Sequence, residues 1–181
     1  MSGHNKWSQI KHQKETADQK RGQLFSKLLN SVALAARINP NPSSNLELQT
    51  AIKKAKDSNV PLENIERALK KATEKSEDLE ELVMEAYGHG GVAILIEAIT
   101  DNKNRTVAEI KKILNDEGGK WAEAGSVRWT FEENRAGKGD RWKAKFPQII
   151  SADDVEKLNH LVGALENHAD IQKVYTTSNA Q

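Results

Sequence analysis

The chain has 181 residues, no cysteine and a formal net charge of +1 at pH 7. The lack of cysteine excludes disulfides, thiolate nucleophiles and zinc sites with cysteine ligands. The near-zero net charge conceals an uneven distribution, because residues 1–82 hold 14 Lys and Arg against 11 Asp and Glu, whereas residues 83–181 hold 13 against 15. Local clusters of charge therefore indicate partners better than the net charge does.

The sequence also bears on compartment and domain number. No apolar run approaches the roughly 20 residues of a membrane span, and the start, MSGHNKW, lacks the features of a signal or transit peptide. These features predict a soluble cytoplasmic protein. A change of character near residue 80 predicts two domains, a basic segment with a helical bundle over residues 1–80 and an α/β domain over residues 81–181.

The first 27 residues are basic. Six Lys and Arg stand against Glu15 and Asp18, with Trp7, Ile10 and Phe25 between them. Lysine and arginine neutralise phosphates, and aromatic rings stack on bases, so the segment has the composition of a nucleic-acid-binding arm. Basic termini are also often merely solvated, so the charge pattern alone leaves both interpretations open.

Three helices are predicted in the first half. Apolar residues at helical spacing predict the first over residues 23–37, and Ser44 with Glu47 forms a capping box for the second, over residues 44–59. Pro61 suits the first turn of the third. Its predicted inward stripe is Leu62, Ile65, Ala68, Leu69 and Ala72. Residues 73–81 are predicted to be a linker or a frayed helix end.

The second half alternates strands and helices. Strands are expected at residues 92–99, 126–131, 141–146 and 171–176, and helices from an Asn104 cap to Gly118 and over residues 153–168. The order βαββαβ predicts an α+β protein whose second domain is ferredoxin-like, with an antiparallel sheet and both helices on one face.

Alternation along the two middle strands predicts what each sheet face shows. The helices are expected to cover the aromatic side, made of Trp129, Phe131, Trp142, Ala144 and Phe146. The opposite face would then show a second basic surface, made of Arg128, Arg141, Lys143 and Lys145. Without exposed aromatics such a face is not expected to read RNA sequence, and ordinary solvated charges are the alternative.

No motif indicates catalysis. The chain has no HExxH, GxSxG or Walker sequence, and His160 and His168 are expected to be surface residues. The glycine-rich loop Gly88, His89, Gly90 and Gly91 enters a strand instead of leaving one, unlike a phosphate-binding loop. It is interpreted as a tight interdomain turn or as a loop whose backbone approaches RNA. We therefore expect no enzyme activity, no cofactor and no metal.

Several long motifs resemble one family. GHNKWSQIKHQK, ADQKRGQLFSKL, NVPLENIERAL, EAYGHGG, TDNKNRTVAEIKKIL, GSVRWTF and LENHADIQKVYTT are similar to the YebC family, which includes the mitochondrial translational activator of cytochrome c oxidase. The resemblance implies a helical domain, an α+β portion and a non-catalytic role in gene expression. Family members are described as DNA-binding transcriptional regulators and as ribosome-associated factors that help translation through difficult stretches.

The resemblance also implies binding residues. The family's basic segment corresponds to Lys6, Trp7, Lys11, His12, Lys14, Lys20, Arg21 and Lys27. Its DNxNRT motif corresponds to Asp101, Asn102, Asn104, Arg105 and Thr106.

Two features depart from the family pattern. His89 replaces the usual proline of YGPGG, and ENRAGKGDRWKAKFPQ stands where the family inserts a further α/β domain.

The preferred hypothesis is a monomeric translation factor that binds ribosomal RNA through the basic segment, without a membrane partner. A DNA-binding transcriptional regulator and a protein-interaction adaptor are the alternatives. Glu63 and Glu66 at the start of the third helix weigh against a DNA-recognition helix, because they would face phosphates.

Overall fold

The computed structural model describes residues 3–74, 79–134 and 139–178, with side chains described from Ala17 onward. The chain divides into two compact units, Met1–Glu77 and Asp78–Gln181, each with its own buried residues. Among the described residues, no helix is both long enough and apolar enough to cross a membrane.

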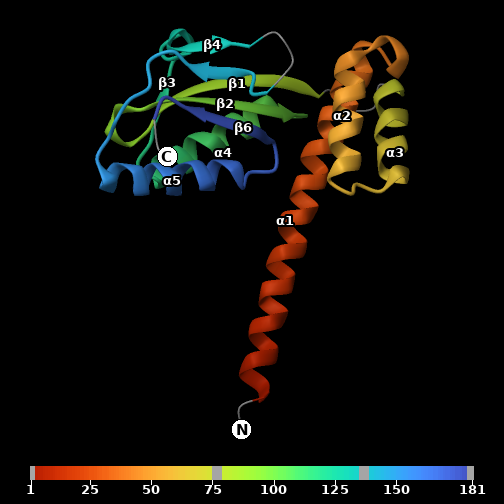
Figure 1. Ribbon diagram of the computed structural model, residues 1–181, viewed down its shortest axis with the longest axis horizontal. Coiled ribbons are helices and arrows are strands. Elements are labelled where there is room, and N and C mark those ends of the chain that lie inside the picture. Colours follow the sequence, from red (N-terminus) through yellow and green to blue (C-terminus); the bar gives the residue numbers. More distant parts are fainter. Residues whose placement is uncertain (1–2, 75–78, 135–138, 179–181) are drawn as a thin grey trace. The chain divides into compact units, whose positions relative to one another are not determined.

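The first unit contains a long helix, a 3₁₀ turn at Pro42–Ser44 and two shorter helices (Figure 1). The helices are α1 (Gly3–Ile38), α2 (Leu46–Asp57) and α3 (Leu62–Thr73). Their shared core lies at the C-terminal end of α1, where Val32, Ala35 and Ala36 are buried. Small and β-branched residues there let α1 pack closely against Leu48 of α2 and Ile65 of α3, which are also buried.

The basic segment is part of α1, because the helix predicted over residues 23–37 begins at Gly3. The apolar periodicity that predicts a helix covers only the part that packs on α2 and α3. The N-terminal part has no such stripe, so its helical state is not visible in the hydrophobic pattern.

The starts of α2 and α3 each differ from prediction by about one residue. The α2 N-cap is Asn45, not Ser44, and its side chain accepts a 2.9 Å hydrogen bond from the Leu48 N–H. The Asn45 amide also donates to the carbonyls of Ala35 and Asn39, so one side chain joins the end of α1 to the start of α2. Pro61 is itself the N-cap of α3, and Leu62, expected in the core, is 56% exposed.

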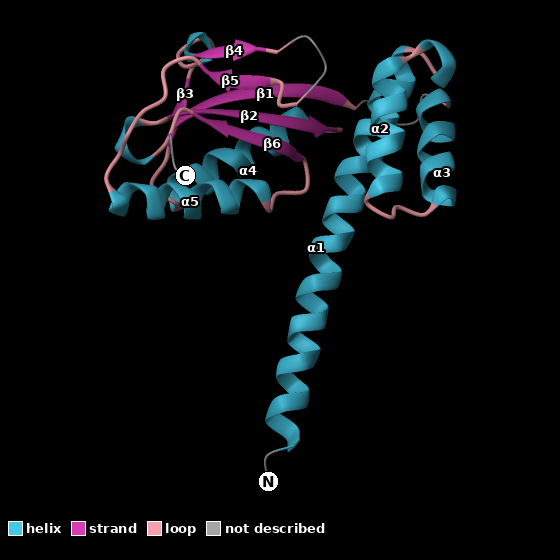
Figure 2. Cartoon of the chain, viewed as in Figure 1, coloured by secondary structure: helices cyan, strands magenta, loops and turns pink. Residues whose placement is uncertain are grey.

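The second unit is built on a four-stranded antiparallel sheet in the order β3-β1-β2-β6. Its strands are β1 (Glu80–Tyr87), β2 (Ala93–Thr100), β3 (Lys120–Ala122) and β6 (Ile171–Thr176). Helices α4 (Lys103–Asp116) and α5 (Ala152–Glu166) lie on one face of this sheet (Figure 2). The core between them contains Ile94, Ile96, Ile110, Leu161 and Leu165, all fully buried.

A two-stranded sheet lies over the other face. Strands β4 (Phe131–Glu133) and β5 (Trp142–Ala144) pair only with each other among the described strands, and a 3₁₀ turn at Arg128–Thr130 leads into β4. Phe131 and Trp142 pack in a second core with Leu95 and Tyr175 of the main sheet. Both faces of the main sheet are therefore covered.

The α+β class, the helical first part and the antiparallel sheet with two helices on one face are confirmed. The order of elements differs from βαββαβ, because β1 is not predicted: its first two residues lie in the predicted linker and the rest are assigned to no element. The strands expected at residues 126–131 and 141–146 form the separate sheet. Glu80, Glu81 and Glu85 make β1 look polar, and that is why the sequence pattern does not reveal it.

The prediction of a bare basic sheet face is wrong. The aromatics expected beneath the helices divide into two groups: Phe131 and Trp142 are buried on the opposite side of the sheet from the helices, whereas Trp129 and Phe146 are 62% and 57% exposed. The physical reason is that the strands containing them form a separate layer, whose inner side faces the main sheet.

Candidate nucleic-acid interface

The N-terminal part of α1 projects past the ends of α2 and α3 (Figure 1). A helix of this length extends for ~54 Å. The buried α1 residues lie between Val32 and Ala36, and every described residue from Ala17 to Gly22 is exposed. Lys20 and Arg21 are therefore presented on a single helix rather than on the bundle surface.

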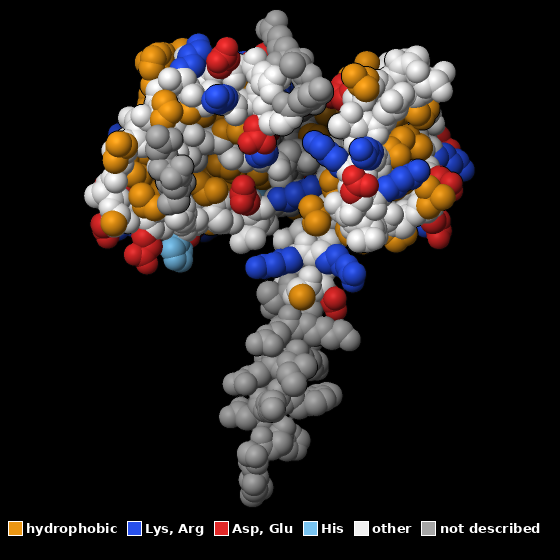
Figure 3. Space-filling view, in the orientation of Figure 1, with side chains coloured by type: hydrophobic (Ala, Val, Ile, Leu, Met, Phe, Trp, Pro, Cys, Tyr) orange, Lys and Arg blue, Asp and Glu red, His pale blue; other side chains and the backbone are white. Residues whose placement is uncertain are grey.

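Lys and Arg side chains protrude from this part of α1 on two sides (Figure 3). Lys20 and Arg21 are exposed, whereas Lys27, closer to the bundle, is half-buried and has an interaction of its own. The side chains of Lys6, Trp7, Lys11, His12 and Lys14 lie outside the described residues, although the backbone there is helical.

The DNxNRT motif forms the start of α4. Asn102, not Asn104, is the N-cap, and its side chain accepts from the Arg105 N–H at 3.1 Å. Asn104 is an exposed residue of the first turn. The cap falls on Asn102 because the strand β2 ends at Thr100, whose hydroxyl in turn accepts from the Asn102 N–H.

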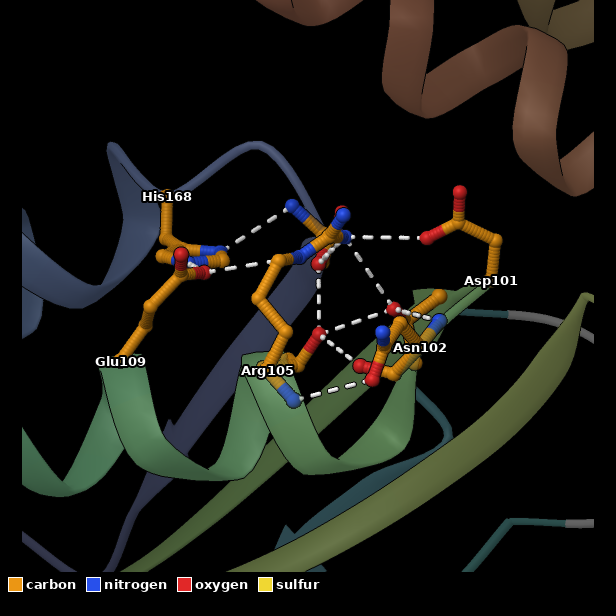
Figure 4. A network of polar contacts seen from close by, with 8 residues as sticks. Asp101, Asn102, Arg105, Glu109 and His168 are labelled. Atoms are coloured by element: carbon orange, nitrogen blue, oxygen red, sulfur yellow. Dashed lines mark hydrogen bonds and ion pairs between the residues drawn. The ribbon is translucent and has the colours of Figure 1, made fainter.

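Arg105 is held by carboxylates rather than left free for phosphate. Figure 4 shows its side chain between Asp101 and the pair formed by Glu109 and His168. Its guanidinium donates to Asp170 at 2.8 Å and lies 3.1 Å from Asp101. These contacts join α4 to the turn before β6, which indicates a structural role for the motif.

Asp170 is the buried centre of this network. The Thr106 hydroxyl donates to its carboxylate at 2.6 Å, beside the bond from Arg105. Burial raises the pKa of the Asp170 carboxyl, but the hydrogen bonds from Thr106 and Arg105 outweigh burial and hold it below its ordinary value.

His168 is not the surface residue that was predicted. Its side chain is 14% exposed and its Nε2 lies 2.8 Å from a Glu109 carboxylate oxygen, while its Nδ1 accepts from the Asp170 N–H. Glu109, His168 and Asp170 have the residue types of a metal site. The Arg105 guanidinium supplies positive charge to the same two carboxylates, at 3.9 Å from Glu109 and 2.8 Å from Asp170.

The glycine-rich loop joins β1 to β2 inside the second unit, so the interpretation as an interdomain turn is wrong. Gly90 and Gly91 have φ of 68° and 72°, conformations that favour glycine. His89 fixes the loop, because its Nε2 lies 2.8 Å from the Glu117 carbonyl oxygen at the end of α4. Gly90 and Gly91 are exposed, and an approach of this backbone to RNA stays a prediction.

The four basic residues predicted for the sheet face have different surroundings. Arg141 is half-buried and forms ion pairs with Glu81, Glu97 and Glu133, so it fastens β5 to the main sheet. The Arg128 guanidinium lies 4.8 Å from the centre of the buried Trp142 ring. Lys143 and Lys145 are exposed and form no ion pair with any residue that the structure describes.

The burial of the Glu85 and Glu97 carboxylates was not predicted from the sequence. Glu85 accepts hydrogen bonds from the N–H groups of Gly125, Val127 and Arg128. Glu97 accepts from the Trp142 indole at 2.9 Å and the Tyr175 hydroxyl at 3.0 Å. Glu97 stands in the middle of an apolar strand, and this is the sequence signal for a buried charge that needs hydrogen-bond donors. Glu85 lies in the more polar β1, where the sequence offers no such signal.

These features define a two-unit α+β protein with a projecting basic helix. Two family models match it: the TACO1/YebC protein N-terminal domain at residues 5–75, and the TACO1/YebC second and third domain at residues 79–138. A protein of Chlorobaculum parvum is 44% identical over 179 residues, which cover 97% of this chain and 69% of the relative. One of Trichlorobacter lovleyi is 51% identical over 136 residues, which cover 74% of this chain and 55% of the relative.

Both relatives are named "Probable transcriptional regulatory protein". The crystal structure of a conserved hypothetical protein from Aquifex aeolicus is also similar, with a TM-score of 0.81 and 30% identity over 88% of this chain and 90% of that one. The chain belongs to the TACO1/YebC family. It spans about half the length of several of the curated relatives that it matches, 55% in the Trichlorobacter case.

Proposed function

We propose that this chain is a nucleic-acid-binding regulator of gene expression, and that its target is structured RNA of the translation machinery. The relatives named as probable transcriptional regulatory proteins support the regulatory role. The basic helix supports nucleic acid as the partner. Ribosomal RNA is the preferred target because phosphate contacts from a projecting helix suit shape recognition of structured RNA.

The observation that carries this proposal is the placement of the basic residues on α1. Among the α1 residues whose side chains are described, the buried ones lie at its C-terminal end and Ala17 to Gly22 are exposed, so this exposed part can meet a partner. A polar helix that packs on nothing gains little stability from its own sequence. Contact with a polyanion would stabilise it, and this is a physical reason for its positive charge. Lys20 and Arg21 are its described exposed cations.

A DNA-binding transcriptional regulator is the second candidate, favoured by the names of the relatives. The described bundle offers it little support, because α3 is a poor recognition helix. Its first turns expose Glu63 and Glu66, and Glu63 pairs with Arg67 along the helix. Carboxylates at the start of a helix that enters the major groove would face phosphates.

Salt dependence tests the role of α1. We expect the double variant Lys20→Gln and Arg21→Gln to flatten the slope of log affinity against log salt by about 1.5, because each phosphate contact contributes roughly 0.7 to 0.9. The measurement is fluorescence anisotropy of a labelled ribosomal RNA hairpin at several salt concentrations.

The matched control is Lys112→Gln with Lys157→Gln, which removes two charges from exposed helical pairs of the second unit. We expect the control to keep the wild-type slope. An α1 variant with an unchanged slope would remove this helix from the interface.

A further inference from the structure

Three aromatic side chains of the second unit lie on its surface, around the turn that precedes β4. Trp129 is 62% exposed, Phe146 is 57% exposed and Tyr87 is 37% exposed. The rings of Trp129 and Phe146 are in contact, with centroids 5.9 Å apart and planes tilted by 52°. We call Tyr87, Trp129 and Phe146 the aromatic patch. Figure 3 shows hydrophobic and basic side chains near one another on the surface over β4.

Hydrogen bonds to Glu85 hold the turn that leads to Trp129. The buried Glu85 carboxylate accepts three backbone hydrogen bonds at 2.6–3.0 Å from Gly125, Val127 and Arg128. A carboxylate satisfied in this way fixes the conformation of the turn, because its removal would leave these N–H groups without their acceptor. Trp129 follows directly on the last of the three donors.

The rings themselves are also oriented. The Ser126 carbonyl accepts from the Trp129 indole N–H at 2.9 Å and from the Tyr87 hydroxyl at 3.4 Å. The Lys145 N–H donates to the Thr130 carbonyl at 2.9 Å, which places residue 146 beside residue 129. Because the polar atom of the indole bonds back to the protein, the exposed part of Trp129 is its apolar ring.

The charge around the patch is mainly positive. Lys143 lies on β5, Lys145 lies between the end of β5 and Phe146, and Arg128 directly precedes Trp129. The exposed acids nearby are Glu132, opposite Lys143 on the neighbouring strand, and Glu123, whose carbonyl accepts from the Ser126 N–H. Lysine is depleted at protein–protein interfaces, whereas aromatic rings flanked by Lys and Arg are typical of surfaces that bind single-stranded nucleic acid.

We propose that the aromatic patch is a base-stacking site for single-stranded RNA. Unpaired bases stack on Trp129 and Phe146, and Lys143 and Lys145 contact the adjoining phosphates. The site rests on the proposed function and adds to it a second contact, for unpaired nucleotides instead of structured RNA. It also departs from the expectation that the second basic surface lacks exposed aromatics, because Trp129 and Phe146 are exposed.

The test compares three labelled oligomers on the full chain by fluorescence anisotropy: a 12-nucleotide oligouridine RNA, its deoxy counterpart, and an abasic chain of the same charge. We expect Trp129→Ala and Phe146→Ala each to weaken binding of the RNA oligomer roughly tenfold, and to leave the weaker binding of the abasic chain unchanged. Trp129→Phe keeps an aromatic face and is expected to retain most of the affinity.

Leu62→Ala is the matched control, because Leu62 is an apolar side chain of similar exposure, 56%, in the other unit. It is expected to bind all three oligomers as the wild type does. Circular dichroism verifies that each variant is folded.

The possible outcomes separate this site from the function on which it rests. Unchanged RNA binding in Trp129→Ala would overturn the site, while a salt slope that depends on α1 would keep the proposed function. Equal losses for the RNA and the abasic chain would also overturn stacking, since charge alone would then explain the effect. Tighter binding of the deoxy oligomer would contradict the assignment to RNA, and a wild type that binds neither oligomers nor the ribosomal hairpin would overturn both proposals.

Discussion

Asp170 shows how single residues of the family motif act in this chain. Its carboxylate receives hydrogen bonds from Thr106 and Arg105, and it thereby connects the start of α4 with the turn before β6. Arg105 would be counted as a phosphate-binding residue from its charge alone. Its bond to a nearly buried carboxylate indicates instead that it stabilises the second unit.

Asp170→Asn tests this role through its pH dependence. The variant is expected to lose about 1 to 3 kcal/mol of unfolding free energy at pH 7, because it weakens charge-assisted bonds in a buried site. The pKa of Asp170 is lowered in the folded state from 3.8. Its contribution is therefore fully present above about pH 4 and is lost as pH falls through the folded pKa. Urea unfolding at pH 7 and near pH 3 should show the two proteins converging in acid.

The control for that experiment is Asp116→Asn, which removes the partner of Lys112 in an exposed helical pair. Exposed pairs of this kind contribute little, so a change below about 0.5 kcal/mol is expected. This role of Asp170 would be contradicted if the difference in unfolding free energy between the wild type and Asp170→Asn stayed the same or grew toward pH 3.

At the residue scale, the sequence predicts which side chains are charged or aromatic but not what surrounds them. The cations of α1 follow directly from composition. The environment of Arg141, with three glutamates around it, depends on strands that are far apart in the sequence. The exposure of Trp129 likewise follows from the separate β4–β5 layer, which no local pattern reveals.

At the scale of elements, the glycine loop between β1 and β2 has two residues in the left-handed region. Gly90 and Gly91 have similar positive φ values, but their surroundings differ. A Cβ on Gly90 would lie 2.7 Å from a methyl carbon of Ile150, whereas a Cβ on Gly91 would meet nothing within 4 Å. The two positions therefore separate backbone strain from steric overlap.

We expect Gly91→Ala to lower the free energy of unfolding by about 1 to 2 kcal/mol, since alanine is strained in the left-handed region. Gly90→Ala should lower it further, because Ile150 must also move. The measurement is urea unfolding of both variants beside the wild type. If the two variants lose the same free energy of unfolding, Ile150 moves aside without destabilising the fold. If neither variant loses stability, the described loop conformation is contradicted.

Periodicity predicts most helices of this chain and fewer of its strands. The helices α2, α3, α4 and α5 each bury an apolar stripe, so their existence is predictable and only their caps shift by a residue or two. The strand β1 is hidden by its glutamates, one of which is buried and satisfied by backbone donors. The N-terminal extension of α1 lacks a hydrophobic stripe to predict it.

At the scale of the whole molecule, the chain combines a helical unit and an α+β unit whose family models together match residues 5–75 and 79–138. The proposed contacts divide between the units: the basic helix belongs to the first and the aromatic patch to the second. The resemblance to the family is visible in the sequence motifs. The second family model ends at residue 138, so residues 139–181, with β5, α5 and β6, lie outside the match.

Co-sedimentation with purified ribosomes tests the central claim most directly. The full chain is pelleted with ribosomes at 50 and 200 mM salt, with an equal mass of duplex DNA as competitor, beside a variant with Lys11, Lys14, Lys20 and Arg21 all changed to Gln. We expect salt-sensitive pelleting of the wild type that survives the DNA, and pelleting of the variant that is weaker by roughly a hundredfold or more at the lower salt. Loss of wild-type pelleting to the DNA, or equal pelleting of the two proteins, would contradict RNA binding through the basic helix.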